Sequence, residues 1–287
     1  METPPSATDK AIAACSFSTH YARMYEEMGN RPTLPTFSVT EPVLSKALFF
    51  HLAQLRYAGW KYAVTVRRDR RHALADVFQD LVAYYLRAAL APHACLVELE
   101  ASMPGANGGD KTQVDIVILK KRGPAEPVPF FAIEVKTTIG RGRIRTEEEK
   151  KPHLARLEQV ASNFRLPDPS NVIFIHEEPS NNTGDFERLY WAKNSKDPTV
   201  PFPGQRKLPR PTDPLYSRIY PLFFGTDPKM WDWSKEKDNR TKKYQKHKTS
   251  FPDITRERFI QEAEQRIVTP LEEVIDLILN ASRAVED

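Results

Sequence analysis

Hydrophobic positions in the middle of the chain follow first a helical and then a strand period. In ALADVFQDLVAYYLRAAL (73–90), apolar residues recur at i, i+3, i+4 and i+7, the spacing of one helical face, and Pro92 follows as a stop signal. Three shorter apolar runs come next, separated by Gly- and Pro-rich turns: 93–103, 114–120 and 130–137, with turns at 104–111 and 122–129. The pattern predicts a helix followed by three strands.

A second helix and a fourth strand are predicted after these three. The helix covers about 147–164 and starts either at a capping box of Thr146 and Glu149 or at Pro152 as first helical residue. The run NVIFIHEE (171–178) is typical of a buried strand. The order helix, three strands, helix, strand indicates a mixed sheet with flanking helices.

The two ends of the chain add further elements. A helix is predicted over 41–60, and the Pro-rich, aromatic stretch 179–252 is largely irregular. Three short strands are also predicted, at 61–67, 187–193 and 217–225. One C-terminal helix follows Asp253 as N-cap. The last opens at a capping box of Thr269, Pro270 and Glu272, and its apolar face consists of Leu271, Val274, Ile275 and Ile278.

We therefore predict an α/β protein with a central mixed β-sheet flanked by helices and with C-terminal helices. Its parts are an N-terminal helical and loop region, a core, and an irregular basic and aromatic region that ends in helices. They span 1–72, 73–178 and 179–287, and a chain of 287 residues can form them as one domain.

Composition narrows the function classes. The net charge is +4, and basic residues cluster at 67–72, 141–145 and 235–248, which permits a polyanionic partner. The two cysteines, Cys15 and Cys95, form no CxxC pair, and the seven histidines show no metal-binding spacing. No apolar run approaches ~18 residues and no signal-peptide core is present, so we expect a cytoplasmic protein without a membrane partner.

Three charged residues stand in or beside two core-type strands: Asp115 in QVDIVIL and Glu134 and Lys136 in AIEVKTT. Alternation along a strand puts Glu134 and Lys136 on one face, and Asp115 can meet Glu134 across an antiparallel pair. Buried charges persist when they are paired, coordinated or functional. The set suits Mg²⁺, with the Val135 carbonyl as an extra ligand and Lys136 next to an attacking water.

This arrangement resembles the PD-(D/E)xK nuclease superfamily, in which an acid opens one strand and E-x-K follows in the next, after an N-terminal helix that often carries another acid. Residue 114 is Val where the family name has Pro. The helix has Phe78-Gln79 where the family often has Phe-Glu. The residue that supplies a further metal ligand is therefore not decided by the motif. Candidates are Gln79, Asp76, Asp80, Glu98 and Glu100, and Asp110 is the alternative to Asp115.

Size and layout are similar to those of a type II restriction endonuclease. The resemblance implies Mg²⁺-dependent hydrolysis of a palindromic duplex DNA site by a homodimer, with Mn²⁺ as a substitute, no organic cofactor, and a bacterial or archaeal host. Expected phosphate contacts are Arg141, Arg143, Arg145, Lys151, Arg156, Arg206, Lys242 and Lys243, with Glu158 and Gln159 nearby. Alternatives are a structure-specific repair or recombination nuclease, an inactive nucleic-acid-binding protein of the same fold, and an α/β protein whose three charges form only a surface network.

Overall fold

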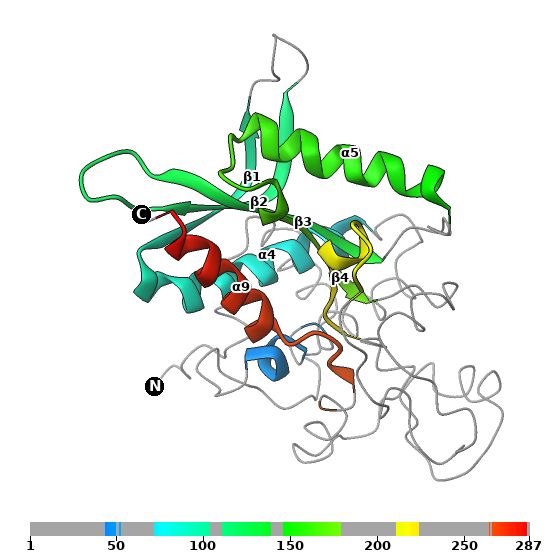
Figure 1. The fold of residues 1–287 in the computed structure, drawn as a ribbon. Helices are drawn as coiled ribbons and strands as arrows, with labels where there is room; N and C mark the ends of the chain where they lie inside the picture. The colour runs from blue at the N-terminus through cyan, green and yellow to red at the C-terminus, as the bar shows by residue number, and fades with distance from the viewer. Residues whose placement is uncertain are drawn as a thin grey trace, which may run out of the picture.

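A five-stranded mixed β-sheet forms the centre of the molecule, in the order β1-β2-β3-β4-β5 (Figure 1). The computed structural model describes residues 44–49, 52, 72–103, 111–138, 146–178, 211–223, 264 and 266–285. The strands are β1 (Cys95–Met103), β2 (Thr112–Lys120), β3 (Val128–Thr138), β4 (Val172–Glu178) and β5 (Ile219–Pro221). Strands β1 to β3 are antiparallel, whereas β4 and β5 continue the sheet in parallel. The predicted α/β class with a mixed sheet is confirmed.

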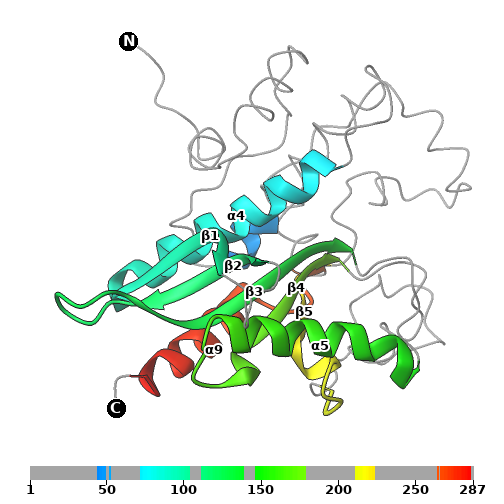
Figure 2. The same ribbon diagram turned by 90° about the horizontal axis from the view of Figure 1, so that it is seen from above.

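Helices cover both faces of the sheet. On one face lie α4 (His72–Leu90) and α9 (Leu271–Arg283), and on the other lies α5 (Glu147–Asn163) (Figure 2). Ile116 and Ile133 belong to the apolar cluster under α4 and α9, and Val117 and Ala132 to the cluster under α5. Both faces of the central strands are therefore buried, which explains their continuous apolar runs.

The predicted order of helix, three strands, helix and strand over 73–178 is confirmed, and most of these boundaries agree within two residues. Strand β3 starts at Val128, earlier than expected, because Pro129 pairs with Leu119 beyond a register shift in the β2–β3 ladder. A proline donates no hydrogen bond, and an irregular ladder near the start of a strand tolerates it. Short 3-10 turns connect elements at Ala91–His93, Pro169–Asn171 and Tyr216–Arg218.

Helix α5 begins at the capping box. The Thr146 hydroxyl accepts a hydrogen bond from the Glu149 N–H at 3.3 Å, and the Glu149 carboxylate accepts one from the Thr146 N–H at 2.9 Å. Pro152 lies inside the helix instead of starting it. Of the two predicted starts, the Thr146 start is therefore correct.

The predicted capping box of α9 is wrong. Pro270 is the N-cap residue and makes no side-chain cap. The Ser45 hydroxyl accepts the Leu271 N–H at 2.7 Å and donates to the Glu272 carboxylate. The free N–H at the helix start is thus satisfied by a serine 226 positions away, in the helical segment 44–49. The predicted apolar face of α9 is buried as expected.

The remaining terminal predictions are met in part. Of the predicted strand 217–225 the structure describes residues up to 223, and among these the three-residue β5 is followed by a bridge between Phe223 and Ile267. The strands predicted at 61–67 and 187–193 and the Asp253 cap lie outside the described residues. In the part of the chain that the structure describes, no helix combines the length and apolar character needed to cross a bilayer.

Candidate functional site

Strands β2 and β3 separate at the point where the three charged residues lie. Their backbone pairing ends at Ile116 opposite Ile133, immediately before Asp115 and Glu134. On the other side of β2, the facing residue Glu100 has a positive φ of 52° and breaks the β1–β2 ladder. Val114 packs under α5 but Ile116 packs under α4, although a regular strand would point both to one face.

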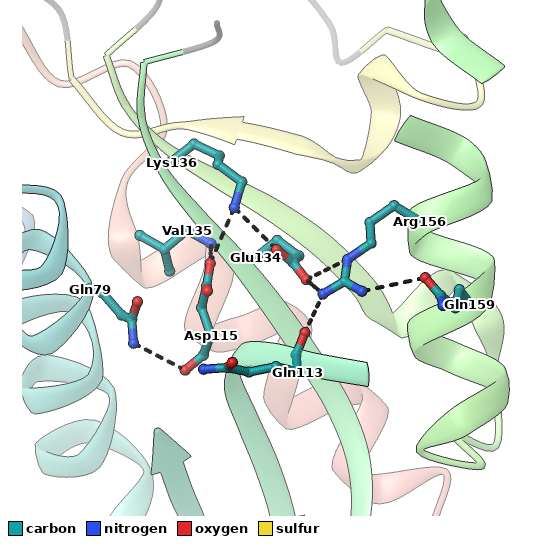
Figure 3. Close-up of polar contacts among 8 residues, drawn as sticks. All are labelled: Gln79, Gln113, Asp115, Glu134, Val135, Lys136, Arg156 and Gln159. Carbon is teal, nitrogen blue, oxygen red and sulfur yellow. Dashed lines mark hydrogen bonds and ion pairs between the residues drawn. The ribbon is translucent and has the colours of Figure 1, made fainter. Parts of the chain in front are cut away.

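This irregularity lets the Asp115 side chain point along the sheet toward β3. Its Oδ2 accepts the backbone N–H of Val135 at 2.6 Å, replacing a ladder bond to β2 (Figure 3). The N–H and C=O of one strand residue point to the same neighbouring strand, so the Val135 carbonyl also faces β2. The Asp115 carboxylate and this carbonyl are thus directed into the same gap.

Lys136 joins the two acids. Its Nζ lies 3.1 Å from Glu134 Oε2 and 3.4 Å from Asp115 Oδ2 (Figure 3). The side chain of Glu134 is 6% exposed, that of Asp115 24% and that of Lys136 43%. The two carboxylates therefore flank one ammonium group that is open to solvent. The predicted convergence of Asp115, Glu134 and Lys136 is present in the structure.

Arg156 on α5 is the second cation at Glu134. Its Nε and Nη2 donate to Glu134 Oε1 at 3.0 and 2.6 Å. Nη2 also donates to the Gln113 carbonyl, and Nη1 to Gln159 Oε1 at 3.4 Å (Figure 3). A carboxylate that is almost fully buried needs such partners, because desolvation without pairing is costly. Glu134 is held between Arg156 and Lys136.

The candidates for a further ligand lie elsewhere. Gln79, on α4, donates to the backbone carbonyl of Asp115 at 3.5 Å instead of joining the carboxylates. Asp80 is buried on α4, and Glu98 and Glu100 are exposed on the edge strand β1. The side chain of Asp76 and all of Asp110 lie outside the described residues. Within the described ranges, no three His, Cys, Asp or Glu side chains gather as a metal-ligand set.

Two histidines lie beside Lys136, although the spacing of the histidines along the chain does not indicate a site. His176 on β4 is the register partner of Lys136, is 5% exposed, and its Nδ1 has no hydrogen-bond partner in the part of the chain described. Burial, with a smaller effect of the Lys136 and His153 charges, lowers the pKa of His176 to about 3. Burial and the Lys136 charge also lower the pKa of His153 on α5. Both imidazoles are therefore neutral near pH 7.

The structure describes only some of the residues that were predicted to contact phosphate. Arg156 and Gln159 face the site, whereas Lys151 is exposed and pairs with Glu148 at 2.6 Å. Glu158 is exposed on α5. The other basic candidates lie outside the described residues: Arg141, Arg143, Arg145, Arg206, Lys242 and Lys243.

Comparison with protein-family models, curated proteins and solved structures gives no significant match, so the functional argument depends on the site itself.

Proposed function

We propose that the chain is a Mg²⁺-dependent DNA endonuclease with a restriction-endonuclease-like core, acting as a homodimeric type II enzyme on a palindromic duplex site. The observation that carries the proposal is the meeting of Asp115, Glu134 and Lys136 where β2 and β3 separate. Two acids on diverging strands can hold a divalent cation, and a lysine between them can act on a water or phosphate beside it, which supports metal-assisted phosphodiester hydrolysis.

The donor set fits Mg²⁺. Asp115 and Glu134 hold carboxylate oxygens on either side of the half-exposed Lys136 ammonium, and the Val135 carbonyl faces β2, from which Asp115 comes. Mg²⁺ prefers oxygen ligands and commonly uses one or two carboxylates together with waters and phosphate oxygens, so a third acid is not needed. Mg²⁺ bound there would supply positive charge to the scissile phosphate and acidify a bound water.

Lys136 is the cationic side chain that acts on the water and the phosphate in this proposal. The half-exposed Lys136 ammonium can orient the attacking water and stabilise the negative charge that develops on the phosphate. In the hydrolysis, water adds to phosphorus and the bond to the 3′ oxygen breaks. The released oxygen takes up a proton, leaving a 3′-hydroxyl and a 5′-phosphate, as the resemblance implies.

Incubation of plasmid DNA with the protein and MgCl₂ tests the proposal. Asp115→Asn, Glu134→Gln and Lys136→Ala should each lower the cleavage rate by about 10²-fold or more, and EDTA should abolish cleavage. Glu126→Gln and Lys121→Ala are matched controls, because both residues are exposed in the β2–β3 turn. Unchanged cleavage in the Lys136→Ala protein, or no cleavage of any diverse DNA by the wild type, contradicts the proposal.

One observation favours a second candidate, a non-catalytic nucleic-acid-binding protein of the same fold. Glu134 is already neutralised by Arg156 and Lys136, so the site is stable without a metal. Salt-dependent DNA binding without magnesium-dependent turnover would identify this case. A repair nuclease would instead cleave junctions, flaps or ends and leave intact plasmid uncut.

A further inference from the structure

Arg156 contacts the same carboxylate that the proposed cation needs. Its guanidinium donates twice to Glu134 Oε1, while its remaining contacts are the Gln113 carbonyl and Gln159 Oε1. These latter contacts keep the guanidinium beside the site without using Glu134. Glu134 Oε2 is held by Lys136. Both oxygens of this carboxylate are therefore occupied by cationic side chains.

The charges in the site show what must change when a cation enters. Asp115 and Glu134 contribute two negative charges, and Lys136 and Arg156 two positive charges, so the group is neutral as it stands. A divalent cation adds two positive charges, which the buried Glu134 and the partly exposed Asp115 cannot offset while they remain paired. A DNA phosphate next to the cation supplies negative charge and a new acceptor for a guanidinium.

We propose that Arg156 is an exchangeable counter-ion: it neutralises Glu134 in the metal-free protein and moves to a phosphate of the DNA when the divalent cation takes its place. This inference rests on the proposed nuclease function. It implies that the cation and DNA bind cooperatively, because each favours the arrangement in which Arg156 has left Glu134. Such coupling is reciprocal: the factor by which DNA raises the affinity for the cation equals the factor by which the cation raises the affinity for DNA.

The affinity of Arg156 variants for Mg²⁺ in the absence of DNA distinguishes an exchangeable counter-ion from a purely structural ion pair. If Arg156 only held Glu134 in position, the charge-preserving substitution Arg156→Lys would weaken cation binding or leave it unchanged. If Arg156 competes with the cation, removal must strengthen cation binding in the absence of DNA. A hydrogen bond to a charged group is worth about ten- to a hundredfold in an equilibrium constant, and the gain should be of this order.

Calorimetric titration with MgCl₂ alone, without DNA, measures this effect. We expect Arg156→Gln to bind Mg²⁺ about ten- to a hundredfold more tightly than the wild type, and to cleave plasmid more slowly despite that. Arg156→Lys should fall between them, since an ammonium lacks the fork that reaches Glu134 and the Gln113 carbonyl together. Arg283→Gln, the same change at an exposed position on α9, should match the wild type.

Thermal unfolding gives a second readout if Arg156→Gln folds poorly without metal. Its melting temperature should be lower than that of the wild type in EDTA and should rise more steeply with MgCl₂. Equal or weaker Mg²⁺ binding by Arg156→Gln, beside a wild type that binds Mg²⁺ and cuts DNA, overturns the inference alone. A wild type that neither binds Mg²⁺ nor cuts DNA overturns the proposed function, and this inference with it.

Discussion

Lys136 has two carboxylates on one side and a neutral imidazole on the other. Asp115 and Glu134 accept hydrogen bonds from its ammonium. His176 lies directly across the β3–β4 ladder and stays uncharged, because burial opposes its protonation. A charged imidazole at this position would repel Lys136 inside the sheet. The neutral His176 therefore preserves the charge balance of the site.

His176 should make the protein sensitive to acid. Its folded-state pKa of about 3 is below the ordinary value of 6.5, so the unfolded chain binds a proton there over a range in which the folded protein does not. The free energy of unfolding then falls as the pH decreases from about 6.5 toward 3. Between pH 7.5 and 4.5 this group alone should remove roughly 2–3 kcal/mol.

Urea unfolding of His176→Phe at these two pH values checks the effect. Phe keeps an aromatic ring at this buried position but cannot bind a proton, so the variant should lose roughly 2–3 kcal/mol less than the wild type on acidification. His93→Gln, at an exposed position, should behave like the wild type. Parallel pH profiles for the wild type and His176→Phe would show that His176 is not the source of the sensitivity.

The sequence predicts only part of this site. Asp115, Glu134 and Lys136 could be found because strand alternation is a local property and because charges are rare in core-type strands. Arg156 was predicted to contact phosphate, but its bond to Glu134 depends on how α5 lies over the sheet. His176 could not be assigned, since its place beside Lys136 results from a parallel pairing between distant segments.

Helix α5 is fixed at its N-terminal end by a second ionic group. Lys150 is buried and donates to Glu147 at 2.7 Å and to Asp213 at 2.5 Å, and its ammonium lies 5.3 Å from the centre of the Tyr216 ring. Hydrogen bonds to Asp213 and Glu147 raise the pKa of Lys150. This contact joins α5, which carries Arg156, to the segment 211–218.

Asp213→Asn should show how much the ion pair with Lys150 stabilises the fold, separately from the backbone hydrogen bonds that Asp213 accepts in its own turn. Burial raises the pKa of Asp213, but hydrogen bonds from Lys150 and from the Tyr216 and Leu215 N–H groups outweigh it and lower the pKa. Asparagine can still accept those two N–H groups but leaves Lys150 with a weaker partner. We expect a loss of about 2 kcal/mol in the free energy of unfolding, between the values of exposed and buried pairs.

Urea denaturation measures this loss, with Glu148→Gln as control. That substitution breaks the exposed pair with Lys151 on the same helix turn and should change the stability measurably less. If both variants lose the same stability, Lys150 does not anchor α5 through Asp213.

Local signals explain which element boundaries could be predicted. The start of α5 follows a capping box whose two members are three residues apart, so the sequence contains the whole motif. The start of α9 instead depends on Ser45, and no spacing near Thr269 indicates a partner so far along the chain. Strand β5 is short because it forms only where the chain meets β4. The boundaries of α9 and β5 thus depend on partners that are distant in the sequence, and hydrophobic periodicity does not predict them.

The central sheet of the molecule separates two apolar clusters. The cluster under α4 and α9 also includes residues of the segment 44–52, and the cluster under α5 includes Leu215 and Ile219. Strands β2, β3 and β4 contribute side chains to both clusters. The site lies at the end of the β2–β3 pairing, so its geometry depends on both faces.

A cavity on either face should therefore weaken one common folding unit. Ile278 on α9 and Leu157 on α5 are both fully buried, on opposite sides of the sheet. Ile278→Ala and Leu157→Ala should each lower the free energy of unfolding by about 2–5 kcal/mol. Because the two clusters share β2, β3 and β4, each variant should unfold in a single transition in urea, with far-UV circular dichroism and hydrogen exchange of β3 amides giving the same midpoint. If α5 packed on the sheet as an independent layer, Leu157→Ala would release the helix signal before the β3 amides exchange. Two separated transitions in that variant would then contradict a shared core.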